Sequence, residues 1–344
     1  MVDLLRKLVE PHFPQSSVGL ESGFATVVKL KGRKKSHFVL RNAAHIPLPE
    51  SLLVPDFDTQ NIQNQDDLVA KLGYLFNYAG IDQRSVGKLS LTLPESSTKT
   101  VVVSIQPPAK ASGAEIEEML NWKIEKSLGS ASSELRISKQ QIGDRRNGSG
   151  DGTLSYIVTA IRVALLAEYE GLFSKLGIKV GLIMPRCLAE SLWLRLGPGS
   201  GMAVSGTVSA AGHDKLLLST SSAGISIIIS NAHGNPLFVR SIRCLADEMP
   251  DELFRALMYY RDRIVGTVVG SGPGKKTISS FLLTGIELSE QTVVDIIQEV
   301  LEAEPDSELK SLSANDLGLD LPSESNLNFP LLAAPAGLAA INHM

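Results

Sequence analysis

The sequence predicts an α/β fold with two lobes that face each other across a cleft. Residues 17–44 and residues 215–242 share one design, in which strands rich in β-branched residues flank tight turns. Amphipathic helices alternate with strands along the rest of the chain, which favours packed α/β units over a helical bundle. The length of 344 residues also exceeds what one core usually supports. The repeated strand-turn-strand segment therefore indicates a weak internal duplication.

Composition and charge exclude several classes of function. The net charge is -4, with 33 Lys and Arg against 37 Asp and Glu, so the chain lacks the basic surplus that nucleic-acid binding requires. Cys187 and Cys244 stand alone and the six histidines are scattered, so we expect reduced thiols and no metal site. The apolar stretch 331–341 contains Pro335 and is shorter than a membrane span, so we expect no transmembrane helix.

The first lobe is expected over residues 1–106. It opens with a meander of three strands that contains the turn after Glu21, and a helix follows from Asp67 to Ala79. Strands at 88–93 and 98–106 complete this unit.

An inserted α/β module is expected over residues 107–180. Pro107 and Pro108 break the chain, a helix from Ala114 to Ser127 follows, and a flexible tip at 144–152 separates two strands. The remaining boundaries follow from similar changes of pattern: a return to the first lobe at 181–200, the second lobe at 201–328, and a C-terminal helix at 329–344 that packs on the first lobe.

Together these features resemble the actin-like ATPase superfamily, and within it the PilM family of type IV pilus assembly proteins. The fold that the resemblance implies is an actin-like, two-lobed α/β fold with duplicated strand-turn-strand cores and an inserted module. The similar segments are Gly19-Leu20-Glu21 with Val27 to Leu30, Pro47-Leu48-Pro49, Leu237 to Ile242, Asp251 to Tyr260, and Ala333 to Ala339.

The resemblance implies two phosphate loops, and both depart from the pattern of an ATP site. Such a site needs a carboxylate at each loop to hold magnesium and glycines that let backbone N–H groups approach phosphate. In the first loop Glu21 stands where the family has Asp, and Ser22, Gly23, Phe24 and Ala25 align with its phosphate-contacting residues. In the second loop Ser219, Ser221, Ser222 and Gly224 stand where the family has an Asp-x-Gly pattern, and no carboxylate remains there.

The second lobe also departs from the family. The helix beginning near Asp251 follows Ile242 closely, so the small subdomain expected there is reduced, and the adenosine turn keeps Gly285 alone. We therefore interpret these residues as a vestigial nucleotide site in a protein that is not expected to catalyse hydrolysis. ATP and Mg²⁺ are the only cofactors that the resemblance suggests.

The resemblance also implies a partner and a location. The family captures the cytoplasmic tail of a PilN-like membrane protein in a groove between the first lobe and the inserted module. Candidates to line that groove here are Phe76, Tyr78 and Trp122. Pilus assembly ATPases are further possible partners. We expect a pseudo-ATPase scaffold in the cytoplasm of a bacterium, held at the inner membrane only through its partners.

Two alternatives stay open at this point. One is an ATP-binding switch or slow ATPase of the same fold, in which Glu21 serves as the metal carboxylate. The other is the cytoplasmic platform subunit of a type II secretion system. The lack of a transmembrane helix after the second lobe argues against the second alternative.

Overall fold

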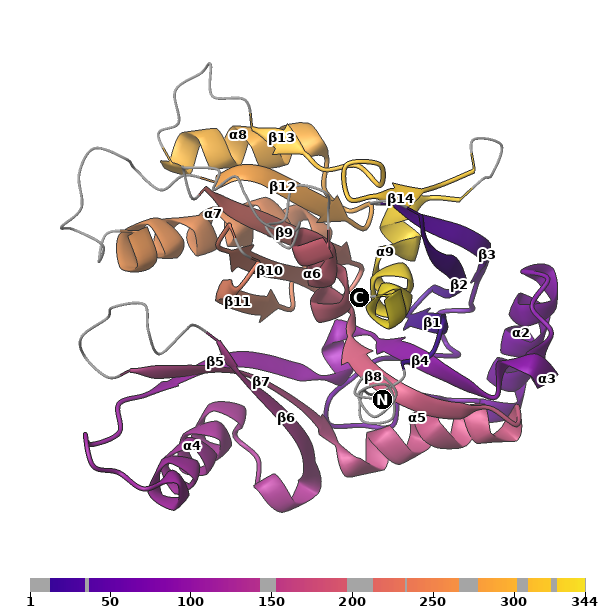
Figure 1. Cartoon of the computed structure of the whole chain (residues 1–344), viewed down its shortest axis with the longest axis horizontal. Coiled ribbons are helices and arrows are strands. Elements are labelled where there is room, and N and C mark those ends of the chain that lie inside the picture. Colours follow the sequence, from indigo (N-terminus) through magenta and orange to yellow (C-terminus); the bar gives the residue numbers. More distant parts are fainter. Residues whose placement is uncertain are drawn as a thin grey trace, which may run out of the picture.

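The computed structural model describes residues 13–34, 37–142, 153–196, 213–232, 234–265, 278–301, 309–322 and 327–343. These residues form three β-sheets with helices between and around them (Figure 1). The tip expected at 144–152 lies outside the described residues.

The first sheet has six strands in the order β14-β3-β2-β1-β4-β8. The first three strands of the chain form an antiparallel meander, and β4 lies parallel to β1. The strands are β1 (Ser16–Glu21), β2 (Phe24–Lys34), β3 (His37–Pro47), β4 (Lys88–Leu93), β8 (Lys179–Pro185) and β14 (Leu319–Asp320).

The second sheet repeats this order as β11-β10-β9-β12, with the short β13 added at its far edge. Here β9, β10 and β11 form the meander, and β12 lies parallel to β9. The strands are β9 (Asp214–Ser221), β10 (Gly224–Ser230), β11 (Pro236–Ile242), β12 (Ile278–Thr284) and β13 (Lys310–Ser311). The identical strand order confirms the internal duplication that the sequence predicted.

Helices fill the layers on both sides of the two sheets. Val27 of β2 faces a core shared with α2 and α5, while its neighbour Val28 faces α6, α9 and the second sheet. The α-helices are α2 (Gln65–Tyr78), α3 (Gln83–Val86), α4 (Gly113–Leu128), α5 (Val163–Lys175), α6 (Arg186–Leu196), α7 (Met249–Tyr259), α8 (Glu290–Leu301) and α9 (Phe329–Ala340). Short 3₁₀ segments at Glu95–Ser97, Ser132–Glu134, Ala246–Glu248 and Ile341–His343 and a π-helical turn at Tyr260–Val265 complete the described elements.

The order of the layers follows from this alternation of side chains. Leu217 of β9 points to the same inner core as Val28, whereas Leu216 and Leu218 point to α7 and α8. The molecule is thus a five-layer sandwich: α2 and α5, the first sheet, α6 and α9, the second sheet, then α7 and α8 (Figure 1). Residues 243–248 alone separate β11 from α7, in keeping with a reduced second lobe.

The inserted module differs from its expected boundaries of 107–180. Its sheet has the order β5-β7-β6, with β5 at Lys99–Ile105, β6 at Leu135–Ile142 and β7 at Leu154–Arg162. Therefore β5, assigned from the sequence to the first lobe, belongs to the module. The helix α5, assigned to the module, instead packs on α2 in the first lobe. The strand β8, whose first two residues were assigned to the module and the rest to the first lobe, pairs with β4. The pairing of strands places the module at about residues 99–162.

A loop of the first lobe that contains Phe57 and Asp58 packs against the module. Phe57 packs into the core of the module, and the Lys99 ammonium lies 4.3 Å from the centre of its ring. The guanidinium of Arg162, at the end of β7, lies 5.4 Å from the same ring and pairs with Asp58 and Glu134. Cation–π and ionic contacts therefore hold this end of the module against the first lobe.

The helices α6 and α9 cross closely between the two sheets. The indole N–H of Trp193 in α6 donates to the carbonyl oxygen of Ala333 in α9 at 2.7 Å. A Cβ atom at Gly337 would lie 2.4 Å from the carbonyl oxygen of Ala189 and 3.1 Å from the Trp193 indole nitrogen. Only glycine lets the two helix backbones approach this far.

Gly337→Ala should therefore destabilise the protein by about 1–3 kcal/mol through overpacking between α6 and α9. Urea unfolding followed by tryptophan fluorescence measures the change. Gly113→Ala is the matched control, because a Cβ atom at Gly113 meets nothing within 4 Å. Equal unfolding free energies for the two variants would contradict the close crossing.

Candidate functional site

Two equivalent hairpin turns border the cleft between the lobes. In the first lobe Glu21 pairs with Phe24 across the two-residue turn Ser22-Gly23. In the second lobe Ser221 pairs with Gly224 across the corresponding turn. A cavity of about 350 Å³ lies between the lobes, and Glu21, Ser219, Ser221 and Gly224 line part of it.

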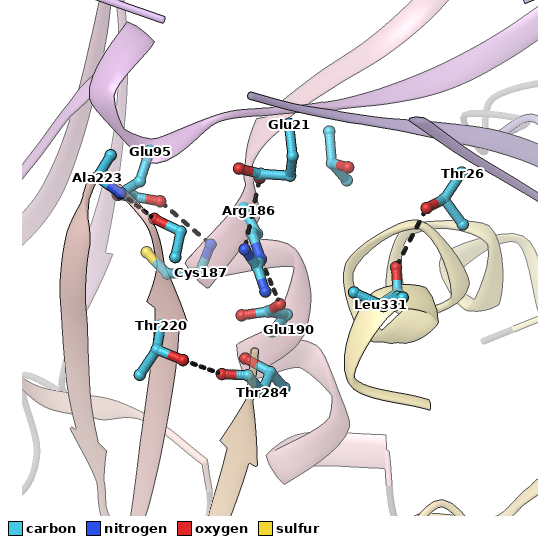
Figure 2. A network of polar contacts seen from close by, with 12 residues as sticks. Glu21, Thr26, Glu95, Arg186, Cys187, Glu190, Thr220, Ala223, Thr284 and Leu331 are labelled. Atoms are coloured by element: carbon cyan, nitrogen blue, oxygen red, sulfur yellow. Dashed lines mark hydrogen bonds and ion pairs between the residues drawn. The ribbon is translucent and has the colours of Figure 1, made fainter. Parts of the chain in front are cut away.

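Arg186, the first residue of α6, lies at the centre of the cleft. Its Nη1 is 3.8 Å from Glu21 Oε1, and its Nε donates to Glu190 Oε1 at 2.9 Å (Figure 2). Arg186, Glu21 and Glu190 are all buried. A buried arginine remains charged because its pKa is very high, and here the field of Glu190 and Glu21 raises that pKa further against the effect of burial.

Glu95 connects three parts of the molecule. It follows β4 in the first lobe and accepts a hydrogen bond from the Cys187 backbone N–H at 3.2 Å. Its other carboxylate oxygen accepts from the Ser241 hydroxyl of β11 at 3.1 Å. A second contact across the cleft joins Arg243 to Asp56 at 2.8 Å. The two lobes are therefore joined by side chains on either side of the cavity.

Burial raises the pKa of two carboxyl groups in the cleft, those of Glu21 and Glu95. Desolvation raises the pKa of Glu21 to about 7, although Arg186 opposes the shift, and nearby Glu190, Glu95 and Glu287 add to it. Burial likewise raises the pKa of Glu95, against the lowering effect of its hydrogen bonds from Cys187 and Ser241. One arginine thus faces more carboxyl groups than its charge can balance.

Internal packing accounts for two of the three candidate glycines. Gly224 has φ +140°, and a Cβ atom there would lie 2.0 Å from the carbonyl oxygen of Ile242. Gly285 has φ +90°, and its Cβ atom would lie 2.2 Å from Thr220 Oγ1. Gly23 has neither a positive φ nor a close neighbour, so nothing within the fold requires glycine at that turn.

These residues do not fit a magnesium–nucleotide complex. Glu21, the carboxyl group expected to hold the metal, is turned to the Arg186 guanidinium. The second hairpin offers hydroxyl groups from Ser219 and Ser221, which are weak ligands for magnesium without a carboxylate beside them. Within the described residues, no group of three His, Cys, Asp or Glu side chains is arranged to hold a metal ion.

The candidate nucleotide residues divide into two groups. Those that the structure brings together at the cavity are Glu21, Ser219, Ser221 and Gly224. Ala25 is fully buried in the core of the first lobe, so its assignment to a phosphate loop is wrong. The others lie at or beside the turns but outside the lining of this cavity: Ser22, Gly23, Phe24, Ser222 and Gly285.

The candidate partner residues do not form one groove. Phe76 is fully buried among the leucines of α2, so its assignment to a partner surface is wrong. Tyr78 is 66% exposed and stacks on Tyr74 along the outer face of α2. Trp122 is 63% exposed on α4, and Figure 1 places α4 at the opposite end of the molecule from α2. A single site cannot contain both Tyr78 and Trp122.

Sequence reasoning missed the residues at the centre of the cleft. Arg186 and Glu190 stand at i,i+4 directly after Pro185, a spacing that places both on one face of a helix. Glu95 is the second residue after the strand β4, at the edge where polar residues of parallel strands gather. These two local signals were present, but neither shows which carboxyl groups the arginine meets.

The two lobes, each built on the same meander and separated by α6 and α9, have the actin-like fold. Among solved structures, the chain is similar to one in a PilM-PilN type IV pilus biogenesis complex, with 13% identity, coverage of 97% of this chain and 100% of that chain, and a TM-score of 0.66. At this identity the likeness establishes the fold and nothing further.

Two further solved structures have lower TM-scores. A Bacteroides thetaiotaomicron protein with an actin-like ATPase fold and unknown function has 13% identity, covers 97% of this chain and 98% of its own, and has a TM-score of 0.45. The cytoplasmic domain of EpsL, an inner membrane component of the Vibrio cholerae type II secretion system, has 10% identity, covers 84% and 95%, and has a TM-score of 0.40. No protein-family model and no curated protein sequence matches the chain.

None of the helices in the described part of the chain is long and apolar enough to cross a membrane.

The raised pKa of Glu21 predicts a pH dependence of stability. The carboxyl group has a pKa of about 7 in the folded protein against an ordinary value of 4.5, so the folded protein holds this proton more tightly than the unfolded chain. Stability is therefore lost as the pH rises from about 4.5 to about 7. Glu21→Gln removes this loss, and its unfolding free energy relative to wild type should rise by up to about 3 kcal/mol across that window.

Urea unfolding at pH 5 and pH 8 measures this difference. Glu50→Gln serves as the control, because Glu50 is exposed and should give the same small difference at both values. A Glu21→Gln difference that does not change with pH would contradict the buried, Arg186-facing position of Glu21.

Proposed function

We propose that this protein is a non-catalytic scaffold of a type IV pilus-like assembly platform at the bacterial inner membrane. Its partner in this proposal is the cytoplasmic tail of a PilN-like membrane protein, and its location is the cytoplasmic face of that membrane. The observation that supports it most directly is the position of Arg186. Its guanidinium occupies the space between the hairpins and pairs with Glu21, where an ATPase needs a free carboxylate.

The joined lobes support the same proposal. Contacts between Glu95 and Ser241 and between Asp56 and Arg243 span the cleft. An actin-like switch needs lobes whose separation depends on the nucleotide. A protein that holds its lobes together with its own side chains is better suited to presenting a constant binding surface.

Calorimetry with Mg-ATP tests the non-catalytic part of the proposal. We expect no saturable heat of binding, because the Arg186 guanidinium lies against Glu21 and leaves no open metal site there. Saturable binding that Glu21→Ala abolishes would instead support the ATP-binding switch. Glu50→Ala, at an exposed position, is the control for a general effect of removing a carboxyl group.

A binding assay with a PilN-like cytoplasmic tail tests the partner. The immobilised tail peptide should retain the full-length protein at micromolar concentration, and the same peptide in scrambled order should not. Arg186→Ala changes the cleft and leaves the partner surface as it is. A folded Arg186→Ala variant should therefore still bind the tail peptide. Failure of the tail to bind at high peptide concentration would contradict this partner.

A type II secretion platform is the alternative assembly in which a scaffold of this fold acts. The appropriate cytoplasmic partner peptide from such a system, used in the same assay, separates the two. Binding to that peptide alone would move the scaffold to a secretion platform and leave its non-catalytic character unchanged.

A further inference from the structure

The module carries a groove that is separate from the cleft between the lobes. It lies between α4 and the chain that follows β5, and its volume is about 570 Å³, within the usual range for ligand sites. Ile105, Pro108, Ala111, Met119 and Trp122 give it a largely apolar lining. Figure 1 shows α4 on the side of the module away from α2 and the first sheet.

Trp122 is the main apolar group of this groove. Its side chain is 63% exposed, whereas Trp193, the other tryptophan of the chain, is fully buried. The Lys126 ammonium lies 5.2 Å from the centre of the Trp122 ring, and Met119 lines the groove beside it. An exposed tryptophan next to a flexible methionine is typical of protein-binding hot spots.

The charged side chains that line the groove differ in their hydrogen-bond partners. The Lys123 ammonium donates to the Ser104 carbonyl oxygen, so its charge is already held by the module. The Glu115 carboxylate accepts from the backbone N–H and hydroxyl of Ser112, as the capping box of α4. Glu118 is exposed, and among the described residues it has no hydrogen-bond or ion-pair partner. The lining therefore has two carboxylates against one ammonium, with Lys126 beside Trp122 as a further cation.

The size of the groove sets the kind of occupant. The α4 residues that line it, from Glu115 to Lys123, span a little more than two helical turns or about 12 Å. About three to four residues of an extended peptide cover the same distance. The groove is thus long enough for a peptide segment with one apolar anchor and one charged neighbour.

We propose that this groove binds a short extended peptide in which an apolar side chain packs on Trp122 and Met119 and an adjacent Lys or Arg pairs with Glu118. This deepens the proposed function and rests on it in one respect, that the module is the part of the scaffold that receives a partner. The proposal places the peptide site on the side of the module that carries α4, away from α2.

The fluorescence of Trp122 reports whether a peptide binds in the groove. A short synthetic peptide of alternating Leu and Arg, free of aromatic residues, should shift the emission of the full-length protein to the blue and protect it from acrylamide quenching. The same peptide with Glu in place of Arg should not. Trp122→Phe should remove the shift, because the remaining Trp193 is buried.

Affinities are compared with a dye-labelled form of the Leu-Arg peptide by fluorescence polarisation. Trp122→Ala should weaken binding at least about tenfold. Glu118→Lys should weaken it about three- to tenfold. Matched controls are Tyr78→Ala, an equally exposed aromatic residue on α2, and Glu170→Lys, an exposed carboxyl group on α5. Both controls should keep the wild-type affinity.

The outcomes separate this site from the proposed function. Equal binding of the Arg and Glu peptides, or equal loss in Tyr78→Ala and Trp122→Ala, would overturn the site. A PilN-like tail that binds wild type and Trp122→Ala alike would also overturn it, while leaving the scaffold proposal intact. Loss of tail binding in Trp122→Ala with retention in Tyr78→Ala supports both.

Discussion

The ion pair between Arg186 and Glu190, with Glu21 beside it, is the interaction on which the middle of the molecule depends. A buried charge must be matched by partners in the interior, since the cost of leaving it unpaired is several kcal/mol. Arg186 begins α6, and α6 together with α9 separates the two sheets. This one side chain therefore links the start of the helical layer to the first hairpin turn at Glu21.

The charged groups of this cleft differ from those of a nucleotide site. A nucleotide site neutralises anionic phosphates with a metal ion and backbone N–H groups. Here the cation is part of the chain, and the anions are carboxyl groups of Glu21, Glu95, Glu190 and Glu287. The charged groups of such a cleft all belong to the chain, so its geometry is set by folding and by the protonation of its carboxyl groups.

Local patterns predicted the fold well because the hairpins and amphipathic helices are encoded by neighbouring residues. The turns after Glu21 and Ser221 and the repeated strand order followed from β-branched runs and turn residues. The strand Lys99–Ile105 was recognised but placed in the wrong unit, since a strand pattern does not specify the sheet it joins. Phe76 and Trp122 both occur on amphipathic helices, and burial separates them only after the helices are packed. The contacts of Arg186 join residues far apart in sequence and have no local pattern.

The position of α9 has a consequence for how the protein is made. This helix supplies Leu332, Ala333 and Ala336 to the core between the sheets, yet it follows every other α-helix and every strand along the described part of the chain. On the ribosome the first lobe and the module can acquire their sheets while synthesis continues. The layer between the lobes has to wait for residues 329–340. Until then α6 alone supplies helical cover to the inner faces of both sheets, and the apolar side chains that α9 covers in the finished protein stay exposed.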